Sequence, residues 1–273
     1  MSSQTNYVPE GFHSLTPYLV CQGTSRLLEF LKQAFAAEET FRMNREDGTI
    51  GHASARIADS MLEMADLTDE WKAMPAGLHL YVSNADEVYG RAIQAGARYL
   101  YEPRDMDYGD REGGVEDPSG NQWYIATRKA GKHFAPEGFR SVTPGMSVKD
   151  AAKFLQFLVK AFDANVVEKN ETPGGSVGHA TVRIGDSIFE CSEAHGQWGP
   201  RAATLHLYVP DVDAVYERAL KTGATSLSEP KDQFYGERNG GVMDAWGNHW
   251  YVATHKESLS KEEVEKRASA QGR

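Results

Sequence analysis

The apolar positions of residues 14–66 change between two spacings, which predicts a strand, a helix and three further strands. Residues 14–21 alternate between apolar and polar side chains, as a strand requires. A helix capped by Thr24 or Ser25 follows, and its apolar face would carry Leu27, Leu31, Ala34 and Phe35. Strands are expected near 38–44, 49–57 and 60–66. Turns at Asp47-Gly48 and Ala58-Asp59 would separate them.

The same order of elements begins again at residue 78. A strand is expected at 78–82, and Asn84 is placed to cap a helix that Gly96 ends. Strands near 97–102, 111–116 and 121–127 complete this second βαβββ unit.

Residues 6–129 align with residues 133–256 at a shift of 127 without a gap. For example, Gly120-Asn-Gln-Trp-Tyr returns as Gly247-Asn-His-Trp-Tyr. The chain is therefore predicted to be a tandem duplication of one domain, with a linker near 130–137 and a charged tail at 257–273. In the tail, Ser260 and Glu263 fit a capping box, which predicts a short helix.

Composition and charge favour a small-molecule partner. Apolar residues make up 40% of the chain and charged residues 25%, which is typical of a globular protein. The net charge of −10 disfavours binding to nucleic acid or to an anionic membrane surface. The excess of acidic over basic residues differs between the copies, because the first copy has 20 acidic and 12 basic residues and the second has 15 and 12.

Other classes of protein find no support in the sequence. The chain lacks an apolar run of about 18 residues and a secretory signal, so we expect it to be cytoplasmic. Cys21 and Cys191 do not occupy matching places, and both are expected to be buried and reduced. No nucleophile elbow or phosphate-binding loop is present, so no nucleotide cofactor is expected.

Four βαβββ units in this order resemble the vicinal oxygen chelate superfamily, which includes glyoxalases, bleomycin-resistance proteins and dioxygenases. The motifs that carry a narrower resemblance to its PhnB-like branch are Pro17-Tyr-Leu, Gly51-His-Ala, Leu78-His-Leu-Tyr-Val, Tyr108-Gly-Asp-Arg111 and Asp117-Pro-Ser-Gly-Asn121. The resemblance implies an α+β fold, in which pairs of units close into cup-shaped open barrels with helices outside. Four units would make two cups, formed within each copy or by exchange of units between copies. A monomer would then hold two complete cups, although a homodimer stays open.

Strand alternation indicates which side chains would face the cups. The polar residues gather on one side of the strands, as a binding cavity requires. In the first copy these concave positions are His52, Ser54, Arg56, Met61, Glu63, His79, Tyr81, Gln122 and Tyr124. A two-residue turn at Ala58-Asp59 would place Ser54 opposite Glu63.

Metal-dependent members of the resembled superfamily take ligands from the first and last strand of each unit. In this sequence those positions fall on Thr16, Glu63, Gly77 and Tyr124, and in the second copy on Thr143, Glu190, Thr204 and Tyr251. Only one of four side chains in each copy suits a divalent ion. The usual chemistry of glyoxalase I and of extradiol dioxygenases is therefore disfavoured.

Two interpretations of the remaining polar cluster stay open. His79 with Glu63 and His52 could form a displaced set of two histidines and one carboxylate for a divalent metal, with His179, Glu190 and His206 as the second-copy counterparts. Alternatively, Glu63 forms a salt bridge to Arg56, and the histidines are hydrogen-bonded in a polar wall.

Aromatic and basic residues add candidates for ligand contact. Tyr81, Tyr124, Tyr208 and Tyr251 are predicted to line the cavities. Arg111 and Arg238 are placed either to hold an anionic ligand at the cup mouth or to tie down a loop. Trp71 and Trp198 lie in loops where they would cover a ligand or the rim of the cup.

Two functions follow from these observations. The first is a protein that binds a small organic ligand in two cavities, for sequestration or carriage. The second is a lyase or isomerase acting on a small carbonyl compound, with Glu63 and Glu190 as base or metal ligand. The missing ligands favour the first.

Overall fold

The computed structural model describes residues 7–130, 133–196 and 198–270. Residues 131–132 of the predicted linker, and the first residues that bear on a secretory signal, lie outside this described part. The first copy forms β1 (Leu15–Cys21), α1 (Thr24–Phe35), β2 (Glu38–Asn44), β3 (Ile50–Ile57), β4 (Ser60–Asp66), β5 (Gly77–Tyr81), α2 (Ala85–Gln94), β6 (Arg98–Asp105), β7 (Asp110–Glu116) and β8 (Gln122–Arg128). The second copy repeats this order.

The second copy and the tail complete the architecture. Their elements are β9 (Val142–Val148), α3 (Ala151–Phe162), β10 (Asn165–Glu171), β11 (Val177–Ile184), β12 (Ser187–Glu193), β13 (Thr204–Tyr208), α4 (Val212–Lys221), β14 (Thr225–Asp232), β15 (Glu237–Met243), β16 (His249–His255) and α5 (Lys261–Ala270). The predicted βαβββ order is therefore confirmed in both copies.

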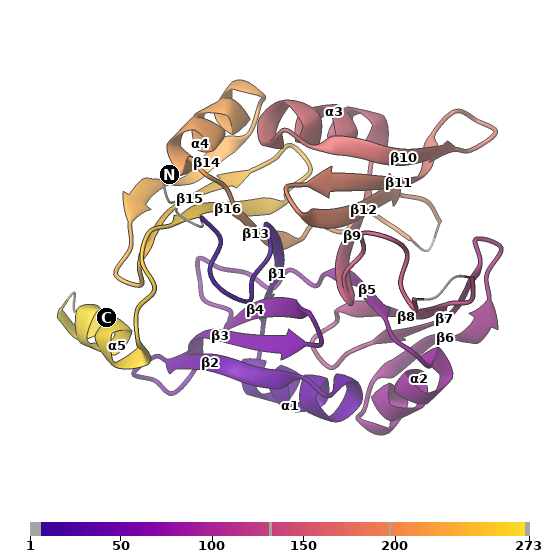
Figure 1. Ribbon diagram of the computed structural model, residues 1–273, viewed down its shortest axis with the longest axis horizontal. Coiled ribbons are helices and arrows are strands. Elements are labelled where there is room, and N and C mark those ends of the chain that lie inside the picture. Colours follow the sequence, from indigo (N-terminus) through magenta and orange to yellow (C-terminus); the bar gives the residue numbers. More distant parts are fainter. Residues whose placement is uncertain (1–6, 131–132, 197, 271–273) are drawn as a thin grey trace.

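The units are exchanged between the copies. One eight-stranded sheet has the order β14-β15-β16-β13-β1-β4-β3-β2, and the other has the order β10-β11-β12-β9-β5-β8-β7-β6. In the first sheet β1 pairs with β13, and in the second β5 pairs with β9. Each sheet thus joins one unit from each copy. We name the concave side of the first sheet cup A and that of the second cup B; Figure 1 shows the two sheets side by side.

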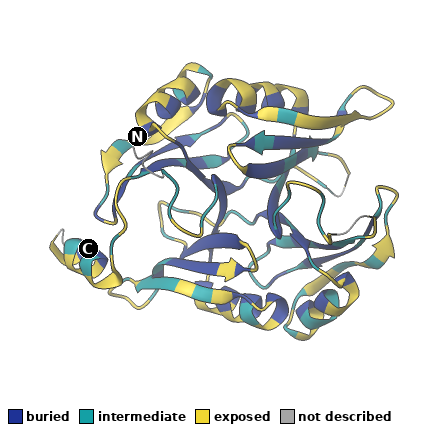
Figure 2. Cartoon of the chain, viewed as in Figure 1, coloured by how far each residue is buried: buried dark blue, intermediate teal, exposed yellow. Residues whose placement is uncertain are grey.

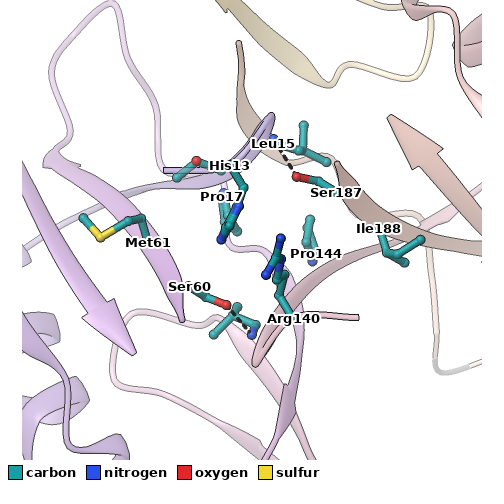
Figure 3. Close-up of a pocket in the computed structure, with 11 residues that line it drawn as sticks. His13, Leu15, Pro17, Ser60, Met61, Arg140, Pro144, Ser187 and Ile188 are labelled. Atoms are coloured by element: carbon teal, nitrogen blue, oxygen red, sulfur yellow. Dashed lines mark hydrogen bonds between the residues drawn. The ribbon is translucent and has the colours of Figure 1, made fainter. Parts of the chain in front are cut away.

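The hairpin turns of each copy hold the other copy in place. The amide of Leu15 donates to Ser187 Oγ (3.0 Å), and the amide of Val142 donates to Ser60 Oγ (2.9 Å). These two bonds cross a small cavity between the sheets, and both are visible in Figure 3. The cavity volume of about 10 Å³ leaves room for about one water molecule. An organic ligand therefore does not fit in this cavity.

The apolar face of each sheet is covered by helices. Leu27, Leu31, Ala34 and Phe35 are buried, as the helical spacing predicts. The outward residues of the strands join the same core, and Trp123 and Trp250 are fully buried in it. Figure 2 shows buried strands between helices whose outer surfaces are exposed.

The start of the first helix corrects the sequence prediction. Thr24 is already the first residue of α1, and neither it nor Ser25 caps the helix. Instead, Asp66 at the end of β4 accepts hydrogen bonds from the amides of Gly23 and Thr24, both at 2.8 Å. A carboxylate from a distant strand thus satisfies the helix N-terminus, which local sequence cannot reveal. The predicted cap of α2 is correct, because Asn84 accepts from the amide of Glu87.

The tail helix α5 bridges the two end strands of the first sheet. Val264 and Ala268 on α5 pack with Phe234, which follows β14, and with Phe41 and Met43 on β2. Ser260 accepts from the amide of Glu263 (3.2 Å), as the capping box predicts. Since β14 and β2 are the ends of this sheet, α5 lies across the open side of cup A (Figure 1).

Two further expectations concern cysteines and membranes. Cys21 and Cys191 are buried free thiols, and burial raises the pKa of Cys191 to about 12. Such thiols are poor nucleophiles. Within the described residues, no helix is long and apolar enough to cross a membrane.

Candidate functional site

The predicted strand register is confirmed at the candidate carboxylates. Ile57 pairs with Ser60 and Ser54 with Glu63 across the hairpin of β3 and β4. The second copy keeps this register, with Thr181 opposite Glu190. Glu63 is buried and Glu190 is only partly exposed, and both lie on the concave side of their strands.

Cup A holds a histidine between two carboxylates. His206 on β13 donates from Nδ1 to Glu63 Oε2 at 2.8 Å, and its Nε2 lies 3.6 Å from Glu237 Oε2 on β15. His52 Nε2 lies 3.8 Å from the other oxygen of Glu63, and Tyr18 bonds to His52 Nδ1 at 3.2 Å. Residues from both copies thus form one cluster.

Cup B repeats this arrangement with the copies reversed. His79 on β5 donates from Nδ1 to Glu190 Oε2 (3.1 Å), and its Nε2 lies 3.0 Å from Glu112 Oε2 without the alignment of a hydrogen bond. His179 bonds to the other oxygen of Glu190 at 3.1 Å. Tyr101 donates to Glu112 at 2.6 Å.

The second carboxylate comes from different positions in the two cups. Glu237 corresponds to Asp110 at the 127-residue shift, whereas Glu112 corresponds to Asn239. Asp110 is one methylene shorter; it accepts from Tyr81 and pairs with Arg128 instead. His206 and His79 nevertheless each lie beside two carboxylates. Because the second carboxylate comes from a different repeat position in each cup, duplication of one residue does not explain it.

The carboxylates keep the central histidines protonated. Burial alone would lower the pKa of His79, but Glu190 and Glu112 raise it to about 10. Glu63 and Glu237 likewise overcome burial and raise the pKa of His206 to about 9. Burial opposes ionisation of Glu190, yet His79 and His179 lower its pKa to about 2.

The carboxylates around His206 differ from one another. Burial would raise the pKa of Glu63, but His206 and His52 together lower it. Burial raises the pKa of Glu237, and its Oε2 has no hydrogen-bond partner among the described residues. The same is true of His206 Nε2 and His79 Nε2. In each cup, a buried histidine nitrogen therefore lies beside a carboxylate oxygen without an aligned hydrogen bond.

The residues present do not fit the metal site that the resembled superfamily uses. After exchange, the four ligand positions of cup A are Thr16, Glu63, Thr204 and Tyr251, and those of cup B are Gly77, Tyr124, Thr143 and Glu190. Each set has one carboxylate. No group of three His, Cys, Asp or Glu side chains in the described part of the chain has a geometry that suits a metal ion. A protonated imidazole also has no lone pair for a metal.

Both interpretations of Glu63 require correction. The displaced set of His52, Glu63 and His79 does not exist, because His79 lies in the other sheet against Glu190. The alternative salt bridge to Arg56 is also absent, since Arg56 pairs with Glu38. The partner of Glu63 is His206, and the exchange of units explains why a single copy did not reveal it.

The two arginines face away from the cups. Arg111 Nη2 donates to Asp86 on α2 at 2.6 Å, and Arg238 Nη2 donates to Asp213 on α4 at 2.7 Å. Alternation along β7 turns Arg111 toward the helix and Glu112 into the cup. Arg111 and Arg238 thus fasten helices to strands, and the prediction that they line the cavity is wrong.

Aromatic rings cover both polar clusters. In cup A, the ring centroid of Trp71 lies 6.0 Å from that of Tyr18 and 5.4 Å from that of Tyr251. In cup B, Trp198 lies 6.3 Å from Tyr101 and 5.7 Å from Tyr124. Tyr81 and Tyr208 stack on the central histidines at 4.3 and 4.4 Å. The tyrosines and tryptophans predicted for the cavities therefore lie beside the clusters.

Sequence reasoning missed Glu112, Glu237 and Tyr101. All three lie in the β6–β7 and β14–β15 hairpins. The glycine pairs Gly113-Gly114 and Gly240-Gly241 interrupt the alternation of apolar and polar side chains there, so the sequence does not indicate which side of the strand faces the cup. The sequence does hold one signal, because Asp110 and Glu112 stand two residues apart and therefore face the same side of the strand.

Comparisons with known proteins agree with this architecture. The family model described as "Glyoxalase/Bleomycin resistance protein/Dioxygenase superfamily" matches residues 12–125 and 138–252. The chain is 34% identical over 143 residues to an uncharacterized protein of Mycobacterium bovis, covering 48% of this chain and 94% of that protein. A Mycobacterium tuberculosis protein, also uncharacterized, shows the same identity over 84% of its length and 48% of this chain.

Solved structures show the same fold at low sequence identity. Glyoxalase I from Zea mays superposes with a TM-score of 0.67 at 12% identity, covering 94% of this chain and 96% of that chain. A putative dioxygenase from Bacillus subtilis gives 0.59 at 11% identity, covering 92% and 87%. These comparisons do not reach the narrower PhnB-like branch, which stays a prediction.

Proposed function

Because the chain belongs to the glyoxalase/bleomycin resistance protein/dioxygenase superfamily, we propose that it binds a small aromatic organic ligand on its concave sheets and sequesters or carries it. The observation that carries this proposal is the composition of each cup. In each cup a histidine with little solvent exposure lies between two carboxylates, one of its nitrogens lacks an aligned hydrogen bond, and tyrosine and tryptophan rings lie beside it. Such a mixture of apolar walls and few polar groups is typical of ligand sites.

The same geometry argues against Glu63 and Glu190 as catalytic bases. A general base works best when its pKa is near the working pH. The pKa of Glu190 is about 2, and that of Glu63 is also lowered, because both accept a hydrogen bond from a protonated histidine. Abstracting a carbon-bound proton would also require breaking that bond.

A lyase or isomerase is the second candidate, and Glu237 favours it. Its pKa is raised by burial, and its Oε2 has no aligned partner in the described structure. Such a carboxyl group is better suited to proton transfer than Glu63 or Glu190. Under this alternative, cup A would be the reactive site and Glu237 would replace Glu63 in the catalytic role.

A ligand panel separates the two candidates. We expect proflavine, acridine-9-carboxylate or both to raise the melting temperature and to quench tryptophan fluorescence, and Trp71→Phe and Trp198→Phe to identify the occupied cup. The exposed variant Glu262→Gln is the control. Binding is overturned if neither compound binds. Turnover of an enolisable ketone or α-oxoaldehyde that Glu237→Gln abolishes would support the enzyme instead.

A further inference from the structure

The two cups differ at the position beside the central glutamate. Tyr18 pairs with Glu63 in the sheet, and Gly145 pairs with Glu190. The Tyr18 ring fills cup A, where it packs against Trp71 and bonds to His52. At Gly145, an added Cβ would find its nearest neighbours, atoms of Glu190, 3.9 Å away. A side chain could therefore begin at Gly145 without a clash, and cup B has no ring at the position where cup A has Tyr18.

In cup B, a tyrosine on a different strand supplies the third aromatic ring. Tyr101 on β6 packs against Trp198, whereas the matching residue in cup A is Ser228. Tyr101 lies on the end strand of its sheet and bonds to Glu112. Its ring thus lies beside Glu112 and against Gly114, and it is not among the neighbours of Gly145.

Exposure of the polar side chains shows the same difference. Glu190 is 13% exposed against 5% for Glu63, and His179 is 44% exposed against 29% for His52. The helix α5 adds to the closure of cup A, since it packs on Phe41, and the Phe41 ring lies 5.9 Å from that of His52.

The surface that receives α5 is absent from cup B. Phe41, Met43 and Phe234 correspond to Glu168, Asn170 and Asp107 at the 127-residue shift. Glu168 and Asn170 are exposed. Charged and amide side chains do not form an apolar surface against which a helix could pack. In the described residues, helices other than α5 pack on the convex faces, so the mouth of cup B has no such cover.

Charge distinguishes cup B further. Glu190 and Glu112 both have lowered pKa values and flank the protonated His79, while Asp110 is paired with Arg128 at 3.0 Å. His179 also bonds to Glu190, and Arg201 acts electrostatically on Tyr124. Two carboxylates with lowered pKa values thus lie beside the aromatic rings of cup B, whereas in cup A burial raises the pKa of Glu237. Aromatic faces and a carboxylate together favour a cation.

We propose that cup B alone accepts a ligand in the native chain, and that the ligand is a flat aromatic cation seated over Gly145 against Glu190 and Trp198. This inference rests on the proposed binding function. It makes Gly145 the residue that determines which cup is occupied, with Tyr18 as the block in cup A.

Proflavine, a planar aromatic cation at neutral pH, is the probe, and acridine-9-carboxylate is the anion of similar shape. Isothermal titration should give one proflavine per chain and at least tenfold weaker binding of the anion. Gly145→Tyr should weaken proflavine binding at least tenfold, whereas the exposed-surface control Glu262→Gln should bind like the parent. Tyr18→Ala should create a second site, and Tyr18→Phe should not.

Each outcome bears on one proposal or both. Two equal sites in the parent chain, loss of binding in Tyr18→Ala with none in Gly145→Tyr, or preference for the anion overturns this inference and leaves the binding function intact. Absence of binding of both compounds overturns the binding function and this inference together. If thermal melting shows that Gly145→Tyr is unfolded, Gly145→Leu replaces it with the same expected loss.

Discussion

At the residue scale, the central feature is a protonated histidine between two acids in each cup. Glu63 and Glu190 could be predicted because a two-residue turn fixes their register. The second acid of each cup could not be predicted, because Glu237 and Glu112 occupy different repeat positions and no local pattern distinguishes a cup-facing acid from a solvated one. The central histidine thus faces a second carboxylate in both cups, although that carboxylate comes from different repeat positions.

These ion pairs should make stability depend on pH. His79 and His206 have folded pKa values of about 10 and about 9, above the ordinary value of 6.5. A raised pKa contributes stability that is complete below about pH 6.5 and is lost as pH rises toward 10. Urea unfolding should therefore show a fall in the free energy of unfolding between pH 7 and pH 10. His79→Gln together with His206→Gln should flatten that slope, and a slope unchanged in this double variant would contradict the ion-pair account.

At the element scale, strands and helices follow from the spacing of apolar residues, whereas their termini depend on distant groups. The strands were predicted within a few residues, since alternation of buried positions is a local signal. The facing of Arg111 was not, because Gly113 and Gly114 interrupt the alternation on β7. The N-terminus of α1 depends on Asp66, which belongs to another strand.

Helix α5 offers a prediction at this scale. Val264→Asp should place a charge in the apolar contact with Phe41, Met43 and Phe234, and it should undock the helix because an unpaired carboxylate resists burial. Amide hydrogen exchange in α5 should accelerate while exchange in β5 and β9 stays unchanged. The exposed neighbour Glu265→Gln is the matched control. Unaltered exchange in Val264→Asp would show that the apolar contact does not hold α5 in place.

At the scale of the whole molecule, exchange of units decides which residues meet. The repeat, the four units and the two cups could be predicted from one sequence. The pairing could not, because β1 meets equivalent strand sequences in β5 and β13, and local rules are satisfied by either partner. The turns that carry Asp59 and Asp186 hold the exchanged arrangement, since each caps the strand that begins the other copy.

The exchange also explains the chemistry of the cups. Each cluster takes its glutamate at the hairpin from one copy and its central histidine from the other. A single copy would leave Glu63 and His79 in unfinished clusters, with buried charges lacking their partners. The proposed ligand binding and the difference between the two cups both depend on this arrangement.

The pKa of His79, measured by NMR titration in two variants, tests that arrangement most directly. Replacing Glu190 by Gln removes the carboxylate bonded to His79 Nδ1, so the pKa should fall from about 10 by at least about one unit. Replacing Glu63 by Gln should leave it unchanged, because Glu63 lies in the other cup against His206. A fall in Glu63→Gln with none in Glu190→Gln would contradict the exchange of units.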